Sequence, residues 1–166
     1  MRVRHITKRD AANYIDLCKK LDQETKFMML EPNERTTNLK EQRNYIQSLL
    51  GAANSMVFVA EHEDKLVGYL GAYGGEFRRN RHNVYLVIGI LQQFAGRGVG
   101  TALFTEMEKW ARQVGVHRLE LTVMTHNIAG VSLYKKMGFT IEGTAKDTLL
   151  VDGNYVDEYY MAKILS

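Results

Sequence analysis

The sequence contains very little cysteine and proline. Among its 166 residues there is one of each, Cys18 and Pro32. A lone cysteine excludes an internal disulfide framework, and such chains are typical of a reducing, cytoplasmic setting. Cys18 shares a predicted helical face with Ala11, Tyr14 and Leu21, so we expect a buried structural thiol rather than a nucleophile.

Long apolar runs and a strong excess of one charge are also missing. No run approaches the ~18 apolar residues that span a bilayer, and the opening MRVRHITKRD has no hydrophobic signal core, so we expect neither a membrane partner nor export. The net charge is +3, from 22 Lys and Arg against 19 Asp and Glu, which is less basic than expected for a general nucleic-acid binder. We therefore interpret the basic run RRNRH at 78–82 as a solvated turn and expect no nucleic-acid partner.

Metal-ligand spacing is absent as well. The histidines His62, His82, His117 and His126 show no such spacing among themselves or with carboxylates, so no metal site is predicted. The remaining composition, 45% hydrophobic and 25% charged, is ordinary for a soluble protein. A chain of this length fits one globular domain, which we expect to span residues 1–166.

Two helix starts are visible early in the chain. Thr7 with Asp10, and Asn38 with Glu41, have the spacing of capping boxes. The first start is followed by apolar residues at helical spacing, at positions 11, 14, 15, 18 and 21. For the second helix we expect a buried side formed by Leu39, Ile46, Leu49 and Leu50. The polar and aromatic segment ETKFMMLEPNERT between the helices is too long to be a simple turn.

The hydrophobic period then changes to that of strands. MVFVAEH and KLVGYLGAYGGEF are rich in β-forming residues and meet at Glu63-Asp64, which predicts a hairpin. HNVYLVIGIL is nearly all apolar, which favours a central strand. The rest of the chain predicts a helix from Val99, a strand RLELTVM, a short helix IAGVSLYKKM closed by Gly138, and two strands joined near Asp152-Gly153. This order predicts a mixed α/β sheet with helices on its faces.

A glycine-rich loop lies between the predicted central strand and the helix that follows it. The N-terminus of a helix exposes unpaired N–H groups and carries roughly half a positive charge. Glycines at 96, 98 and 100 lack the Cβ atoms that would hold a phosphate away from these donors, and Arg97 can add charge at the rim. The loop therefore predicts an anion cradle.

Two familiar phosphate-binding motifs do not fit this loop. A dinucleotide-binding G-x-G-x-x-G motif would need glycine where Thr101 stands, and a nucleoside-triphosphate P-loop would need a lysine after the last glycine. A tight strand-to-helix connection that binds no ligand remains an alternative.

GRGVGTALF, followed about 30 residues later by NIAGVSLYKKMGF, resembles the GNAT superfamily of N-acetyltransferases. The order of elements agrees along essentially the whole chain. The resemblance implies a central, mostly antiparallel sheet flanked by helices, with acetyl-coenzyme A as co-substrate. It departs at Ala95, where the family often has Gln or Arg, and this removes one side-chain contact to the phosphates.

By this resemblance, the predicted central strand splays from its neighbour and its backbone pairs with the pantetheine arm and the acetyl carbonyl. Main-chain pairing suits an amide-rich arm, although an ordinary central strand would have the same residue types. Asn127 also binds the coenzyme in this interpretation, and it fits an ordinary helix N-cap equally well. The implied cofactor-binding residues are Ile88, Gly89, Ile90, Gly96, Arg97, Gly98, Val99, Gly100, Thr101, Asn127 and Tyr134.

Two residues are candidates for catalysis. Tyr134 stands at the family's usual general-acid position, where a phenol can protonate the departing thiolate; the alternative is core packing. Some family members place Glu at the position of Thr122. Glu120 shares its strand face and is our candidate base, with a surface ion pair to Arg118 as the alternative.

The resemblance implies transfer of acetyl from acetyl-coenzyme A directly to a primary amine in a ternary complex. The acceptor would be a small amine, an amino-acid-like compound or a protein N-terminus, and a homodimer is a further expectation. Carboxylates and aromatics expected at the acceptor site favour a cationic amine: Glu24, Phe27, Met28, Glu31, Glu34, Asp152, Tyr155, Asp157, Glu158 and Tyr159. The alternatives are a non-catalytic acyl-coenzyme A sensor and a basic RNA-associated factor.

Overall fold

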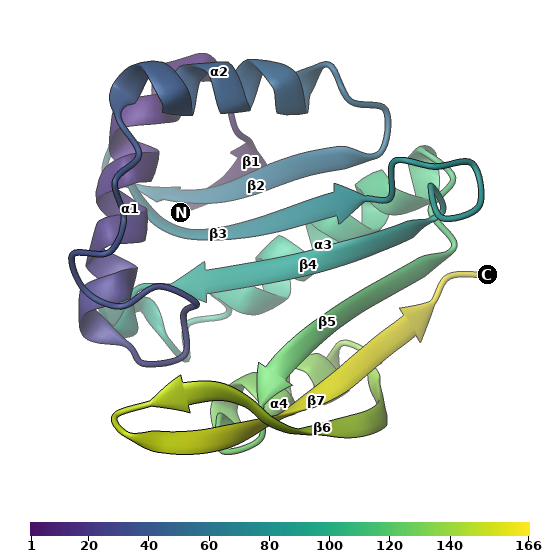
Figure 1. Ribbon diagram of the computed structural model, residues 1–166. Coiled ribbons are helices and arrows are strands. Elements are labelled where there is room, and N and C mark those ends of the chain that lie inside the picture. The colour runs from purple at the N-terminus through teal and green to yellow at the C-terminus, as the bar shows by residue number, and fades with distance from the viewer.

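The computed structural model describes residues 1–166 as one sheet of seven strands flanked by four α-helices (Figure 1). The strands stand in the order β1-β2-β3-β4-β5-β7-β6, and every neighbouring pair is antiparallel except β4 and β5. The elements are β1 (Arg2–His5), α1 (Ala11–Glu24), α2 (Leu39–Leu50), β2 (Ser55–His62), β3 (Lys65–Gly74), β4 (Asn83–Ile90), α3 (Val99–Gln113), β5 (Arg118–Met124), α4 (Ile128–Lys136), β6 (Thr140–Val151) and β7 (Asn154–Ile164). The predicted mixed sheet is confirmed, and β4 is its central strand.

The helices cover both faces of the sheet. Phe58 of β2 packs edge-on against Trp110 of α3, and Tyr69 of β3 packs edge-on against Tyr14 of α1. Because Phe58 lies opposite Leu70 in the register, it points to the face opposite that of Tyr69. Helices α1 and α2 therefore cover one face, and α3 covers the other together with α4. None of these helices combines the length and apolarity required for a membrane crossing.

Both predicted hairpin turns are confirmed. Glu63 and Asp64 join β2 to β3 with φ angles of 50° and 61°, and Asp152 and Gly153 join β6 to β7 with 50° and 79°. Two consecutive residues with positive φ are what a two-residue hairpin needs to match the strand twist.

The sequence analysis missed the first strand, β1. RVRH has one apolar residue and no clear alternation, so no pattern indicated it. The strand forms because its backbone pairs with β2, from Arg2 opposite Glu61 to His5 opposite Phe58. Its existence depends on a neighbour more than 50 residues away.

The helix starts are confirmed, but the buried side of α2 was predicted only in part. The Glu41 N–H donates to Asn38 Oδ1 at 2.8 Å, which closes the predicted cap. Ile46 and Leu49 are buried as expected. The prediction was wrong for Leu39 and Leu50, which are 38% and 43% exposed. They are the first and last residues of α2. The helix covers only the edge of the sheet, so the sheet does not bury its terminal turns.

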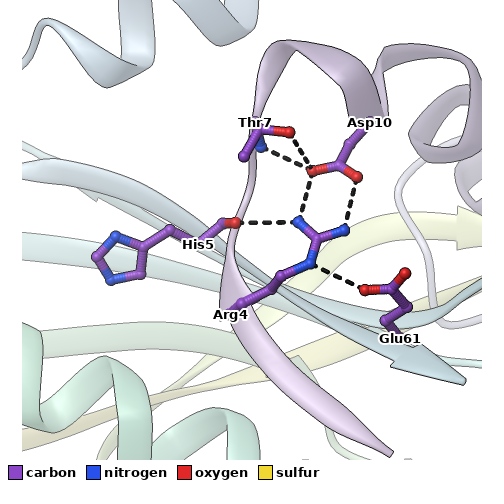
Figure 2. Close-up of polar contacts among 5 residues, drawn as sticks. All are labelled: Arg4, His5, Thr7, Asp10 and Glu61. Carbon is purple, nitrogen blue, oxygen red and sulfur yellow. Dashed lines mark hydrogen bonds and ion pairs between the residues drawn. The ribbon is translucent and has the colours of Figure 1, made fainter.

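A charged network joins β1 to the start of α1 (Figure 2). The Arg4 guanidinium donates to both oxygens of Asp10 at 2.8 Å and to Glu61 at 3.0 Å. The Thr7 N–H and hydroxyl also donate to Asp10, which is 5% exposed. Burial alone would raise the pKa of the Asp10 carboxyl, but the hydrogen bonds from Arg4 and Thr7 outweigh burial and lower this pKa. The network thereby fixes the N-terminal strand to the helix.

We expect Asp10→Asn to lower the free energy of unfolding by about 2–3 kcal/mol, because it leaves the half-buried Arg4 without its main partner. Urea denaturation at neutral pH measures this loss. The pKa of Asp10 is lower in the folded state, so its stabilisation is present above the ordinary value of 3.8 and is lost as the pH falls through the folded-state pKa. The difference between the two proteins should therefore shrink in acid. Asp16→Asn, on an exposed position of α1, is the control; a loss equal to that of Asp10→Asn would contradict the assignment.

Candidate functional site

The central strands β4 and β5 separate at one end of the sheet. They pair in parallel only at Asn83–Arg118, Val84–Leu119 and Tyr85–Glu120. Beyond this point β4 remains paired with β3 as far as Ile90, while its other edge has no strand partner. Figure 1 shows the two strands diverging toward the loop between α1 and α2. The splay expected from the resemblance is present.

A large cavity occupies this gap. Its volume is about 1390 Å³, which exceeds the ~300–1,000 Å³ of ordinary small-molecule pockets. The walls come from the loop after α1, β4, the glycine-rich loop, the end of β5, α4 and the β6–β7 hairpin. The cavity is therefore large enough for two ligands at once.

Glycine is required at the three positions of the loop for different structural reasons. Gly96 and Gly98 have φ angles of 73° and 81°, a left-handed conformation that favours glycine. Gly100 has no positive φ; a Cβ there would lie 2.7 Å from Leu133 Cδ2 of α4. Its small size therefore permits close contact between α3 and α4. All three glycines line the cavity at the N-terminus of α3, where free N–H groups favour an anion.

Lys136 adds a cation beside this helix end, and the sequence analysis missed it. Its ammonium group lies 3.3 Å from the Thr101 hydroxyl, and both residues line the cavity. Arg97 is the one predicted cofactor-binding residue that does not line the cavity; its guanidinium lies over the Phe94 ring, 5.2 Å from the centroid. Two consecutive lysines before Gly138 were the available signal for Lys136.

Tyr134 reaches the cavity from α4. Its ring packs edge-on against Phe104 at 5.8 Å, and the residue is 7% exposed. Burial raises the pKa of its hydroxyl well above the usual value, so the phenol stays protonated at neutral pH. The hydroxyl makes no hydrogen bond within the protein, whereas a tyrosine hydroxyl that is buried only for packing usually has a partner. Core packing and access to the cavity are combined in this residue.

Asn127 also reaches the cavity while it caps α4. Its Oδ1 accepts from the Gly130 N–H at 3.0 Å, and its amide nitrogen has no protein partner. The Oδ1 atom of Asn127 therefore caps the helix, and the Nδ2 group remains free to donate to a ligand in the cavity.

The candidate base Glu120 is held away from the cavity. Its carboxylate accepts from Arg118 at 2.9 Å, and Arg118 also donates to both oxygens of Glu142. Glu120 does not line the cavity. The structure thus places it in the ion pair that was the alternative to a catalytic role.

The expected acceptor walls are present in part. Glu24, Phe27, Met28, Asp152 and Glu158 line the cavity, whereas Glu31, Glu34, Tyr155, Asp157 and Tyr159 do not.

Of the lining carboxylates, Glu24 accepts from the Gln92 N–H and Asp152 is paired with Lys26. Glu158 makes no hydrogen bond or ion pair, and is the free carboxylate of the cavity.

The sequence analysis missed three further wall residues, Lys26, Tyr85 and His126. Lys26 pairs with Asp152 across the mouth of the cavity, and Phe27 packs against His126 at 5.1 Å between ring centroids. Tyr85 also lines the cavity. No sequence pattern indicated these contacts, since they join segments distant in the chain. No three His, Cys, Asp or Glu side chains lie close enough together to form a metal site.

Known proteins share this architecture. A structure described as an acetyltransferase of GNAT family from Streptococcus pneumoniae superposes with a TM-score of 0.96 over 99% of both chains, at 28% identity. The Salmonella typhimurium protein yncA, solved with its cofactor acetyl-CoA, has a TM-score of 0.88 over 100% of this chain and 94% of its own, at 21% identity. The second likeness supports the fold alone.

Two curated relatives are similar in sequence. The L-amino acid N-acetyltransferase AaaT of Escherichia coli K12 is 39% identical over 110 residues, which cover 64% of this chain and 66% of the relative. The [ribosomal protein uS5]-alanine N-acetyltransferase of the same organism is 32% identical over 101 residues, 60% of this chain and 52% of the relative. The matched segments thus span about two-thirds and about half of these relatives.

The model of the acetyltransferase (GNAT) family matches residues 15–139. This segment contains the glycine-rich loop, the splayed strands and all of α4, which together form most of the cavity wall. With the matching architecture of the whole chain, the protein belongs to the GNAT acetyltransferase family.

Proposed function

We propose that this protein transfers an acetyl group from acetyl-coenzyme A directly to a primary amine within a ternary complex. The observation that supports this most is the single cavity that joins a helix N-terminus, the unpaired edge of β4 and the buried phenol of Tyr134. In this proposal the pyrophosphate lies against Gly96, Gly98 and Lys136. The two named relatives act on amino acids or on a ribosomal-protein alanine, which supports an amino-acid-like or N-terminal amine.

The chemistry follows from the placement of these groups. The pantetheine arm pairs with the free edge of β4 at residues 88–90, and a backbone N–H there polarises the thioester carbonyl. The neutral amine attacks the carbonyl carbon, forming a C–N bond and a tetrahedral oxyanion. The C–S bond then breaks, and Tyr134 gives its proton to the departing thiolate. The amine nitrogen loses one proton to water or to a carboxylate.

Thiol release from acetyl-coenzyme A tests this function, with L-alanine, L-methionine, an alanine-initiated hexapeptide and spermidine as acceptors. We expect turnover with at least one of them. Tyr134→Phe should reduce kcat about 100-fold, the usual contribution of a general acid, and leave the Kd of acetyl-coenzyme A within about twofold of its original value. Binding without turnover on every amine would instead support a sensor, and unchanged turnover in the variant would remove the acid role.

The donor site makes a separate prediction. Gly98→Ala should weaken coenzyme A binding about tenfold in calorimetry, because a Cβ would face the phosphates at the end of α3. Gly115→Ala is the matched control, since Gly115 has a φ of 82° with nothing near its Cβ position, as does Gly98. Both substitutions should lower stability by about 1 kcal/mol. Equal affinities of the two variants for coenzyme A would contradict an anion site at Gly98.

For the proton acceptor, we propose Glu158 in place of Glu120, because Glu158 is the free carboxylate of the cavity and Glu120 is paired with Arg118. Glu158→Gln should lower kcat/KM about tenfold or more at neutral pH. Glu120→Gln is the control and should leave kcat/KM unchanged. The opposite result, a loss in Glu120→Gln alone, would restore Glu120 as the base.

A further inference from the structure

The point where β4 and β5 separate is marked by a hydrogen bond between two side chains. Tyr85 is the last residue of β4 that pairs with β5. Its hydroxyl lies 2.6 Å from the Thr122 hydroxyl, two residues beyond the last β5 partner. The bond spans the first step of the gap, and both residues line the cavity. This hydrogen bond lies where the gap between the two strands begins.

The two hydroxyls have hydrogen-bonding capacity to spare. Each hydroxyl has one proton and two acceptor lone pairs. Their mutual bond uses one proton and one lone pair, and neither oxygen has another protein partner. One O–H and several lone pairs therefore remain, and Tyr85 is 38% exposed. An amine nitrogen placed there would find an acceptor for its N–H, which leaves the lone pair of the nitrogen free.

The pair lies on the opposite sheet face from the proposed acid. Tyr85 pairs with Glu120 in the register, and side chains alternate along β5, so Tyr85 and Thr122 point to the same face. Gly89 lies on that face too, where a Cβ would be 2.7 Å from Leu21 of α1. Tyr134 belongs to α4, which packs with α3 on the other face. A thioester threaded through the gap would therefore have the hydroxyl pair on one side and the phenol on the other.

We propose that the Tyr85 and Thr122 hydroxyls together bind the acceptor amine and direct its lone pair at the thioester carbonyl. This inference rests on the proposed acetyl transfer and adds the residues that position the nucleophile. The pair accepts an N–H of the neutral amine, so that the nitrogen lone pair adds to the face of the carbonyl that is turned toward the pair. The proton released after attack goes to water or to Glu158, which lies on the same face because it pairs with Met124. The pair itself gains and loses no proton.

The test uses substitutions that remove one hydroxyl and keep the shape, Tyr85→Phe and Thr122→Val. With the fastest acceptor of the four amines named above, each should lower kcat/KM for the amine about tenfold, mainly through KM, as expected for one lost hydrogen bond in a closed site. The Kd of acetyl-coenzyme A should stay within about twofold of its original value. In the double variant the loss should be smaller than the product of the two single losses, because the hydroxyls act as a unit.

Tyr160→Phe is the matched control. Tyr160 stands directly opposite Thr122 in the register of β7, shares its face and is 52% exposed, but it does not line the cavity. It should leave KM for the amine unchanged. An equal effect of Tyr160→Phe, or unchanged kinetics in Tyr85→Phe and Thr122→Val, would overturn the proposal. So would a changed pH profile of kcat/KM in Tyr85→Phe, since that would assign proton transfer to the phenol.

These outcomes separate the two levels of the proposal. If the unsubstituted protein releases no thiol with any of the four amines, the acetyl transfer itself fails. If it turns over and the variants match it, only the positioning role fails. Thermal unfolding of each variant shows whether the variant is folded. A misfolded variant would also lose acetyl-coenzyme A binding, whereas the loss of a positioning hydroxyl affects only the amine kinetics.

Discussion

The site depends on the loss of backbone pairing between β4 and β5 beyond Tyr85. Elsewhere each strand of the sheet is hydrogen-bonded to its neighbours along most of its length. Backbone N–H and C=O groups rarely remain unpaired inside a protein, because the cost of desolvating them is high. An open edge in the centre of a sheet therefore offers unpaired backbone groups to an amide-rich ligand. The surrounding structure keeps this edge open.

Packing on both faces holds the two strands apart. On one face, Leu21 of α1 and Met28 of the following loop approach the strand at Gly89, where a side chain would not fit. On the other face, α3 and α4 meet where Gly100 contacts Leu133. The loop after α1 is anchored by the Arg35–Asp22 ion pair at 2.8 Å and joined to the final hairpin through Lys26 and Asp152. These contacts shape the walls of the cleft, and a cleft that is formed before binding lowers the ordering cost of binding.

The groups that take part in the proposed reaction lie on opposite faces of the sheet. The buried phenol of Tyr134 and the helix N-terminus lie with α3 and α4, whereas the Tyr85–Thr122 pair and Glu158 lie on the face of α1. A gap that passes through the sheet lets the amine approach the carbonyl from one side of the sheet while the phenol reaches the sulfur from the other. Such separation favours direct transfer, because both partners are held in position at the same time.

The sequence by itself determined the elements that depend on neighbouring residues. The Asp152-Gly153 turn, the Asn38 cap and the glycine-rich loop at 96–100 were all visible, because positive φ angles, capping and helical period are local properties. The tertiary structure alone decided which side chains meet. It paired Glu120 with Arg118, brought Lys136 to Thr101, placed Tyr85 against Thr122 and added β1 to the sheet edge. These contacts join residues from different strands and helices, and their side chains meet only after the sheet register and the packing of the helices have been set.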